Sequence, residues 1–75
     1  LDLSYTQISP TGLRILSRMN DLQTLSLNGV PLNRDTVAPL CRLTRLRSLS
    51  VMETNLTTDQ VQEIQNALPG CLVVD

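Results

Sequence analysis

The sequence has few of the residues that carry chemistry. Its 75 residues include no His, Trp or Phe, one Tyr and two Cys, and all six of its basic residues are Arg. Acid–base and nucleophilic catalysis usually depend on His or Lys, and two cysteines cannot complete a four-ligand zinc site. Aromatic side chains on which bases could stack are also lacking. The composition predicts a non-enzymatic protein with no catalytic residue, no cofactor and no metal site.

Charge and hydropathy exclude two classes of partner. The formal net charge is −1, so the chain lacks the basic surface that attracts nucleic acid or an anionic membrane. No run approaches the roughly 20 apolar residues of a membrane span. Arg42, Arg45 and Arg47 form one charge cluster, which could grip an acidic partner or simply solubilise a connecting segment; we favour the second interpretation because acidic residues balance it. The sequence predicts neither nucleic-acid binding nor membrane insertion.

What the sequence does contain is a repeat with a period of 24 residues. Shifting the chain by this distance aligns apolar residues with one another all along the unit. The aligned sets are Leu1, Leu25 and Leu49; Leu3, Leu27 and Val51; Ile8, Leu32 and Leu56; Leu13, Val37 and Val61; and Leu16, Leu40 and Ile64.

Each unit reads as a strand followed by a helix. The segment 22–27 alternates apolar and polar residues, which is typical of a short strand. Ser9 then has the position of a helix N-cap, and Thr57 with Gln60 has the spacing of a capping box. Helical spacing follows Ser9 at Pro10, Leu13, Leu16 and Met19.

Two places break the regular pattern. Pro39 lies where a helix starting after Asn33 would need its N–H, so we expect a delayed start near Thr36 and a shorter or irregular helix. At the end of the third unit, Leu68-Pro69-Gly70 is expected to absorb one extra residue. That slip would place Leu68, Cys71 and Val74 under Leu43, Leu46 and Leu49, and would put both Leu1 and Asp75 in strands.

The pattern L-x-x-L-x-[L/V]-x-x-[T/V]-x-L, from Leu22 to Leu32 and from Leu46 to Leu56, resembles the leucine-rich repeat family. The resemblance implies an α/β fold, a right-handed solenoid with a short parallel sheet on its concave face and helices on its convex face. It divides residues 1–75 into repeats at about 1–21, 22–45 and 46–70, with a fourth strand starting at 71–75. The helical outer arms are more similar to bacterial or F-box-type arrays than to plant receptor arrays.

The family commonly has Asn at the ninth position of the pattern, where this chain has Thr6, Val30 and Thr54. A threonine hydroxyl can satisfy backbone groups there and a valine cannot, so the turn at Val30 should rely on water or on neighbouring backbone. Each coil of such an array shelters its apolar face only against its neighbours. Because the chain opens on Leu1 in the middle of a pattern, we expect a fragment of a longer array, with flanking repeats or a capping partner at both ends.

In this fold the polar residues between the buried leucines face the concave side. Tyr5 and Met52 are the only sizeable apolar side chains among them, and Tyr5 is the preferred contact because interface hot spots favour tyrosine. Asp75 would join the column of Asp2 after the slip. The predicted binding residues are Asp2, Ser4, Tyr5, Thr24, Ser26, Asn28, Ser48, Ser50, Met52 and Glu53. The alternative is that these are merely solvated strand positions.

The family's usual role makes recognition of a protein or peptide through the concave face the leading hypothesis. A structural spacer within a larger protein is the first alternative. The second is a substrate-selecting arm of a ubiquitin-ligase-like or other multidomain protein, which would require a further domain in the same protein. The residues themselves do not name the ligand.

The two cysteines, Cys41 and Cys71, are expected to be free thiols. Cys41 falls in a polar outer column with Ser17 and Gln65, whereas Cys71 falls in an inward leucine column, so the pair is badly placed for a disulfide. Free thiols favour a reducing compartment such as the cytoplasm. The triplet Asn55-Leu56-Thr57 matches a glycosylation sequon, which would argue the other way, but it coincides with a repeat turn.

Overall fold

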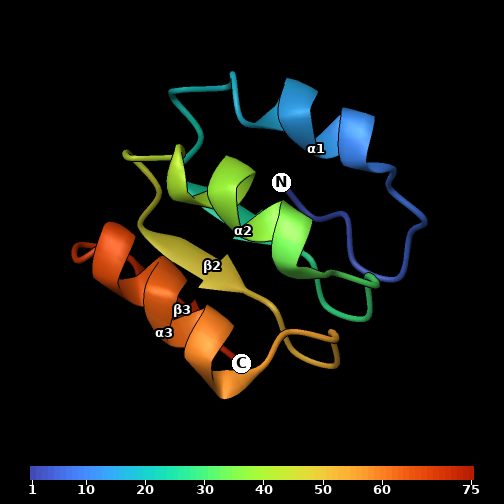
Figure 1. Ribbon diagram of the computed structural model, residues 1–75. Coiled ribbons are helices and arrows are strands. Elements are labelled where there is room, and N and C mark those ends of the chain that lie inside the picture. The colour runs from blue at the N-terminus through green and yellow to red at the C-terminus, as the bar shows by residue number, and fades with distance from the viewer.

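The computed structural model describes the backbone of residues 1–75 and the side chains of residues 1–9 and 11–75. Helices and strands alternate along the chain (Figure 1). The elements are α1 (Pro10–Leu16), β1 (Thr24–Ser26), α2 (Arg34–Cys41), β2 (Ser48–Ser50), α3 (Thr58–Ala67) and β3 (Leu72–Val74). The chain is therefore a mixed helix and strand structure with a small sheet, in agreement with the predicted α/β class.

The three strands form one parallel sheet in the order β1-β2-β3. Pairing joins residues 24 positions apart, since Leu25 lies beside Leu49 and Leu49 beside Val73. The first unit adds only an isolated bridge between Asp2 and Ser26, with the same offset. The expectation that Leu1 lies in a strand is therefore wrong.

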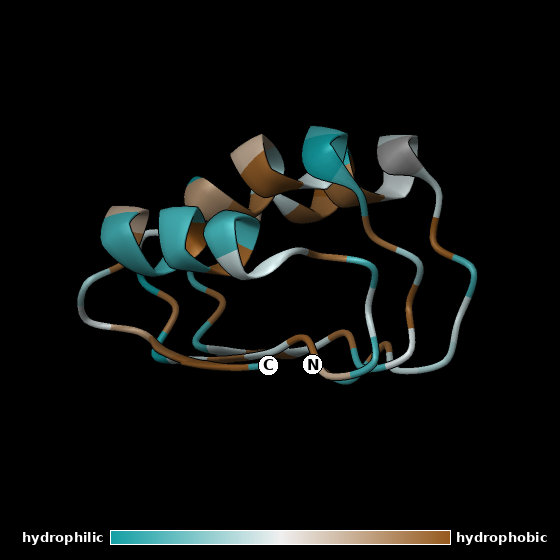
Figure 2. Cartoon of the chain, turned by 60° about the horizontal axis from the view of Figure 1, so that its bottom comes forward, coloured by the Kyte–Doolittle hydropathy of each residue, from teal (hydrophilic) through white to brown (hydrophobic). Residues whose placement is uncertain are grey.

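The helices cover one face of the sheet and leave the other face open (Figures 1 and 2). α1 packs against α2, and α2 against α3. Burying one large aliphatic side chain contributes roughly 1.5–3 kcal/mol, so the aligned leucines are the main stabilising groups. The core between the two layers contains Leu13, Leu16, Leu25, Leu27, Val30, Leu32, Val37, Leu40, Leu43, Leu46, Leu49, Val51, Ile64, Leu68 and Cys71.

The helix starts in the first and third units are confirmed. Ser9 caps α1 by accepting a hydrogen bond from the N–H of Gly12, and Thr57 and Gln60 form the predicted capping box at α3. The α1 helix is shorter than its spacing predicts. It ends at Leu16, and Met19 lies beyond it with 48% of its surface exposed.

The delayed helix start predicted for the middle unit is wrong. α2 begins at Arg34, is capped by the Asn33 side chain at the N–H of Asp35, and carries Pro39 inside it. An interior proline costs about 3 kcal/mol because it removes a backbone donor. The helix forms nevertheless because Val37 and Leu40 are buried on either side of Pro39 in sequence.

The boundary before β3 follows the predicted slip only in part. Leu68 and Cys71 are buried like Leu43 and Leu46, and Cys71 N–H bonds to the Leu68 carbonyl as Leu46 N–H bonds to that of Leu43. Sheet pairing, however, returns to the 24-residue offset. The register places Val73 beside Leu49 and Val74 beside Ser50, so Val74 is not an inward residue and Asp75 lies outside β3.

Both cysteines are free, and Cys71 is buried. The column predicted as polar and outer is in fact turned inward, since Ser17 is buried and Cys41 and Gln65 are half-buried. The Gln65 side-chain amide donates to the carbonyls of Leu68 and Cys71 and thereby supports the longer last turn. Burial raises the pKa of both thiols, that of Cys41 with a smaller contribution from Glu63.

The turns after the strands use the predicted threonines. Thr6 Oγ1 donates to the Leu3 carbonyl at 2.6 Å, and Thr54 Oγ1 donates to the Val51 carbonyl at 2.8 Å. At Val30, which is fully buried, the backbone N–H itself bonds to the Leu27 carbonyl at 3.1 Å. The valine turn thus relies on neighbouring backbone, one of the two options the sequence leaves open.

Candidate functional site

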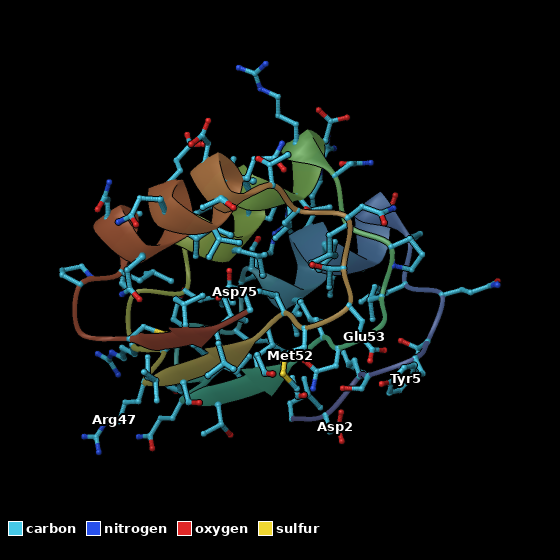
Figure 3. All side chains as sticks on the ribbon, turned by 90° about the horizontal axis from the view of Figure 1, so that it is seen from below. Asp2, Tyr5, Arg47, Met52, Glu53 and Asp75 are labelled. Atoms are coloured by element: carbon cyan, nitrogen blue, oxygen red, sulfur yellow. The ribbon has the colours of Figure 1, made fainter. Side chains whose placement is uncertain are left out.

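The sheet surface turned away from the helices carries the side chains that alternate with the buried strand residues (Figure 3). Leu25 is 2% exposed and Leu49 is fully buried, so the side chains before and after each of them must point away from the core. We term this surface the strand face. Its residues are Asp2, Thr24, Ser26, Ser48, Ser50, Leu72 and Val74.

Four of the predicted binding residues hydrogen-bond to one another across the units. The hydroxyl groups of Ser4 and Ser26 lie 2.9 Å apart, and the Asn28 Nδ2 group donates to Ser26 Oγ at 3.2 Å. Ser50 Oγ then donates to Asn28 Oδ1 at 2.6 Å. The polar groups that sequence reasoning offered to a ligand are thus largely used inside the protein.

Ser4 and Asn28 also support the backbone of the next unit. Asn28 N–H donates to Ser4 Oγ at 3.2 Å, and Met52 N–H donates to Asn28 Oδ1 at 2.9 Å. Each side chain accepts from the backbone N–H of the residue 24 positions further on. That N–H has no carbonyl partner in the sheet. Met52, third in this column, has only a thioether, a weak acceptor.

Tyr5, Gly29 and Glu53 share an unusual backbone conformation in the turns that follow the strand-face residues. Their φ angles are 60°, 72° and 59°, in the left-handed region. The Tyr5 ring lies directly over Gly29, where a Cβ atom would overlap it, and Tyr5 Oη donates to Glu53 Oε2 at 3.1 Å. That hydrogen bond raises the pKa of Tyr5. Tyr5 therefore bridges three units while 71% of it stays exposed.

A shallow groove of about 250 Å³ lies on the part of the strand face formed by the first unit, β1 and β2. It is lined by Leu1, Asp2, Thr24, Leu25, Ser26, Ser48 and Ser50. Among its hydroxyl groups, those of Thr24 and Ser48 make no hydrogen bond within the described part of the chain and are open to a ligand. The Asp2 carboxylate accepts the Ser4 N–H at 2.9 Å, and this hydrogen bond lowers the pKa of Asp2.

The strand face changes character at β3, which sequence reasoning missed. Thr24 and Ser48 pair in register with Leu72, and Ser26 and Ser50 with Val74. Leu72 is 66% exposed and Val74 is 38% exposed. An uninterrupted 24-residue period would have found both, but the assumed slip put Asp75 in this column instead.

The arginine cluster behaves as a solvated segment. Arg45 forms an ion pair with Asp21 at 2.8 Å, in the preceding unit, but 72% and 91% of the two side chains are exposed. Such exposed pairs contribute about 0–1 kcal/mol. Arg47 lies at the end of the sheet opposite to Tyr5 and Glu53 (Figure 3). These observations agree with the solubilising interpretation.

Comparison with known proteins gives no family assignment. No family model matches the chain, and no curated protein is significantly similar to it. None of the described helices combines the length and apolar character needed to cross a bilayer. Within the described side chains, no cluster of three His, Cys, Asp or Glu residues is arranged to hold a metal ion.

Proposed function

We propose that the chain is a segment of a leucine-rich repeat solenoid that binds a protein or peptide through its strand face, which would form the concave side of a right-handed coil. The observation that carries this proposal is that residues 24 positions apart pair directly in the sheet. A solenoid stacks equivalent residues of successive repeats in the same way.

The open surface supports a binding role on the strand face. The helices leave it uncovered, the groove lies on it, and Thr24 and Ser48 offer hydroxyl groups with no internal partner. The three strands and the bridged segment at Asp2 are separated by three spacings, which cover only about 14 Å, whereas a standard interface buries roughly 800 Å² on each partner. A partner would therefore also contact the turns at Tyr5 and Glu53, or further repeats.

The hydrogen-bonded side chains favour a second candidate, a structural spacer. Ser4, Ser26, Asn28 and Ser50 use their polar groups to connect successive units. A spacer needs such connections and no ligand. It predicts that blocking the strand face has no effect on the protein's interactions.

Peptide display separates the two candidates. A library of random 12-residue peptides is selected on the 75-residue chain, and the selected peptides are tested against Thr24→Arg/Ser48→Arg. Neither side chain makes a hydrogen bond within the described part of the chain, so the arginines should cover the groove without disturbing the fold. The control is Gln62→Arg, which adds one such side chain to the exposed side of α3 and removes only the exposed hydrogen bond from Gln62 to Asn66.

Strand-face recognition predicts that the affinity for the selected peptides falls tenfold or more in the double variant and is unchanged in the control. Circular dichroism checks that all three proteins share one fold. Peptides that bind the double variant as well as the original chain would contradict the proposed surface. Failure to select any peptide favours the spacer.

A further inference from the structure

The strand face has an acidic end and an apolar end. One column, read across the sheet, contains Asp2, Ser26, Ser50 and Val74. The neighbouring column ends in Leu72. Asp2 is the only charged side chain that lines the groove, and Leu72 and Val74 expose apolar surface beyond its far side. A complementary ligand would present a cation at one end and an apolar group at the other.

The geometry also fixes the distance between these two groups. Three strand spacings of about 4.8 Å separate Asp2 from Val74, which is about 14 Å. An extended peptide advances about 3.4 Å per residue, so about four residues span this distance. The hydroxyl groups of Thr24 and Ser48 lie beside the path and can bond to the backbone of such a peptide.

Strand addition at the open edge of β3 is a poorer mode of binding. Leu72 N–H already donates to the Arg47 carbonyl and the Val74 carbonyl accepts from Val51 N–H, on either side of β2. The parallel ladder leaves only the groups of Val73 facing outward in this three-residue strand. The strand face therefore offers the side chains of seven residues to a ligand, whereas the edge offers the backbone groups of one. This favours a peptide that crosses the strands.

From this arrangement we infer that the strand face binds an extended peptide in which Arg or Lys precedes or follows a large aliphatic residue by four positions. The cation lies at Asp2, and the aliphatic side chain packs on Leu72 and Val74. This inference rests on the proposed function and adds the class of peptide that is recognised.

In the 75-residue chain used for the test, the N-terminal ammonium would compete with the ligand's cation. The Leu1 ammonium donates to the Thr24 carbonyl at 3.0 Å and lies close enough to Asp2 to help lower its pKa. Acetylation removes this charge but keeps an N–H donor. The test therefore uses the 75-residue chain with an acetylated N-terminus, in which the cation should bind more tightly.

Two peptides of identical composition, both blocked at their ends, test the inference. The first has Arg at position one, Leu at position five and Ser-Gly-Ser between them; the second places Leu directly after Arg. Titration is followed by the amide resonances of the protein. We expect shifts at Ser26, Ser50 and Val74, and an affinity at least fivefold higher for the first peptide.

Three variants check the individual contacts. Leu72→Ser/Val74→Ser places serine in β3 where β2 has Ser48 and Ser50. It should lower the affinity for the first peptide at least tenfold. Asp2→Asn keeps the acceptor for Ser4 N–H and should weaken it about threefold, as expected for an exposed ion pair. Arg34→Gln removes a charge at the start of α2 and should change the affinity less than twofold.

The outcomes distinguish this inference from the proposed function. Equal binding of both peptides on the strand face would overturn the spacing and leave strand-face recognition standing. Shifts confined to the helices, or no binding by either peptide together with a failed display selection, would overturn both. Analytical ultracentrifugation tests for self-association of the chain. If the chain self-associates and Leu72→Ser/Val74→Ser abolishes this, the apolar end binds a second copy and the inferred peptide recognition is overturned.

Discussion

The Asn28 side chain offers the most direct test of how the units are joined. Its amide makes three hydrogen bonds, to Ser26 Oγ, Ser50 Oγ and the N–H of Met52. Asn28→Ala removes all three and introduces no new group. The substitution should therefore weaken the connection between the second and third units, because Ser50 and Met52 belong to the third unit.

The expected loss is about 2 kcal/mol. Each neutral hydrogen bond contributes a net 0.5–1.5 kcal/mol, so three bonds of typical strength, about 1 kcal/mol each, contribute roughly 3 kcal/mol. Water can replace part of this because Asn28 is half-buried and the bond to Met52 is exposed. For a chain of this size, roughly 4–11 kcal/mol of total stability is usual, and 2 kcal/mol would lower the melting temperature by about 8–16 °C.

Urea unfolding followed by circular dichroism measures this loss. Asn28→Ser is the matched variant, because Ser4 already accepts the backbone N–H of Asn28 with a hydroxyl in the equivalent position. It should recover about half of the loss. Asn66→Ala, which removes an exposed asparagine from α3, should change stability by less than about 0.5 kcal/mol.

Hydrogen exchange supplies an independent readout at the Met52 amide. Its protection should fall more than that of neighbouring amides in Asn28→Ala, because its acceptor is removed. A stability loss below about 0.5 kcal/mol, or unchanged protection at Met52, would refute the view that Asn28 joins the units.

Three further substitutions test the turns and caps. Gly29→Ala should cost about 1–2 kcal/mol in urea unfolding, because its φ is positive and a Cβ would overlap the Tyr5 ring; a neutral result would contradict that strain. Thr57→Ala should cost about 1 kcal/mol and Thr57→Ser very little, and equal losses would argue against capping. Glu53→Gln should lower the pKa of Tyr5 towards 10.0, measured by phenolate absorbance. Because that pKa is raised in the folded state, the stability from this bond is complete below pH 10 and is lost as pH rises through the folded pKa; an unchanged pKa would rule out Glu53 as its cause.

Buried apolar columns were the most predictable part of the fold. Residues such as Leu25, Leu49 and Ile64 must leave water, so their spacing alone indicates strand, helix and period. The caps at Ser9 and Thr57 were predictable for a similar reason, since a helix start leaves backbone donors that a nearby hydroxyl can satisfy.

Pro39 shows where local rules are insufficient. Its missing donor predicts a helix that starts late, and the sequence around it does not reveal how much burial the helix gains as a whole. In the folded chain Thr36, Val37 and Leu40 all lose their contact with water on this helix. Their combined burial outweighs one lost hydrogen bond, and only the packed structure exposes this balance.

The last boundary failed for a different physical reason. Apolar matching placed Val74 inward because hydrophobic residues were assumed to be buried. Leu68 and Cys71 do follow the slip, since the turn they close is one residue longer. The sheet register is instead set by the backbone ladder, which joins Ser48 to Leu72 and Ser50 to Val74 irrespective of side-chain polarity.

Most residues of the sheet have a residue type that the fold requires, but the exposed residues of β3 do not. Ser26 and Ser50 belong to the hydrogen-bonded network, and Leu25 and Leu49 belong to the core, so each has a structural reason for its residue type. Leu72 has neither, because two thirds of its surface stays in contact with water and its pairing with Ser48 uses only backbone atoms. Leu72 and Val74 are both exposed on the same face of β3, and neighbouring exposed apolar side chains mark interaction sites more often than a lone exposed leucine does. The apolar end of the strand face is therefore the part of this surface for which a binding partner supplies the simplest physical reason.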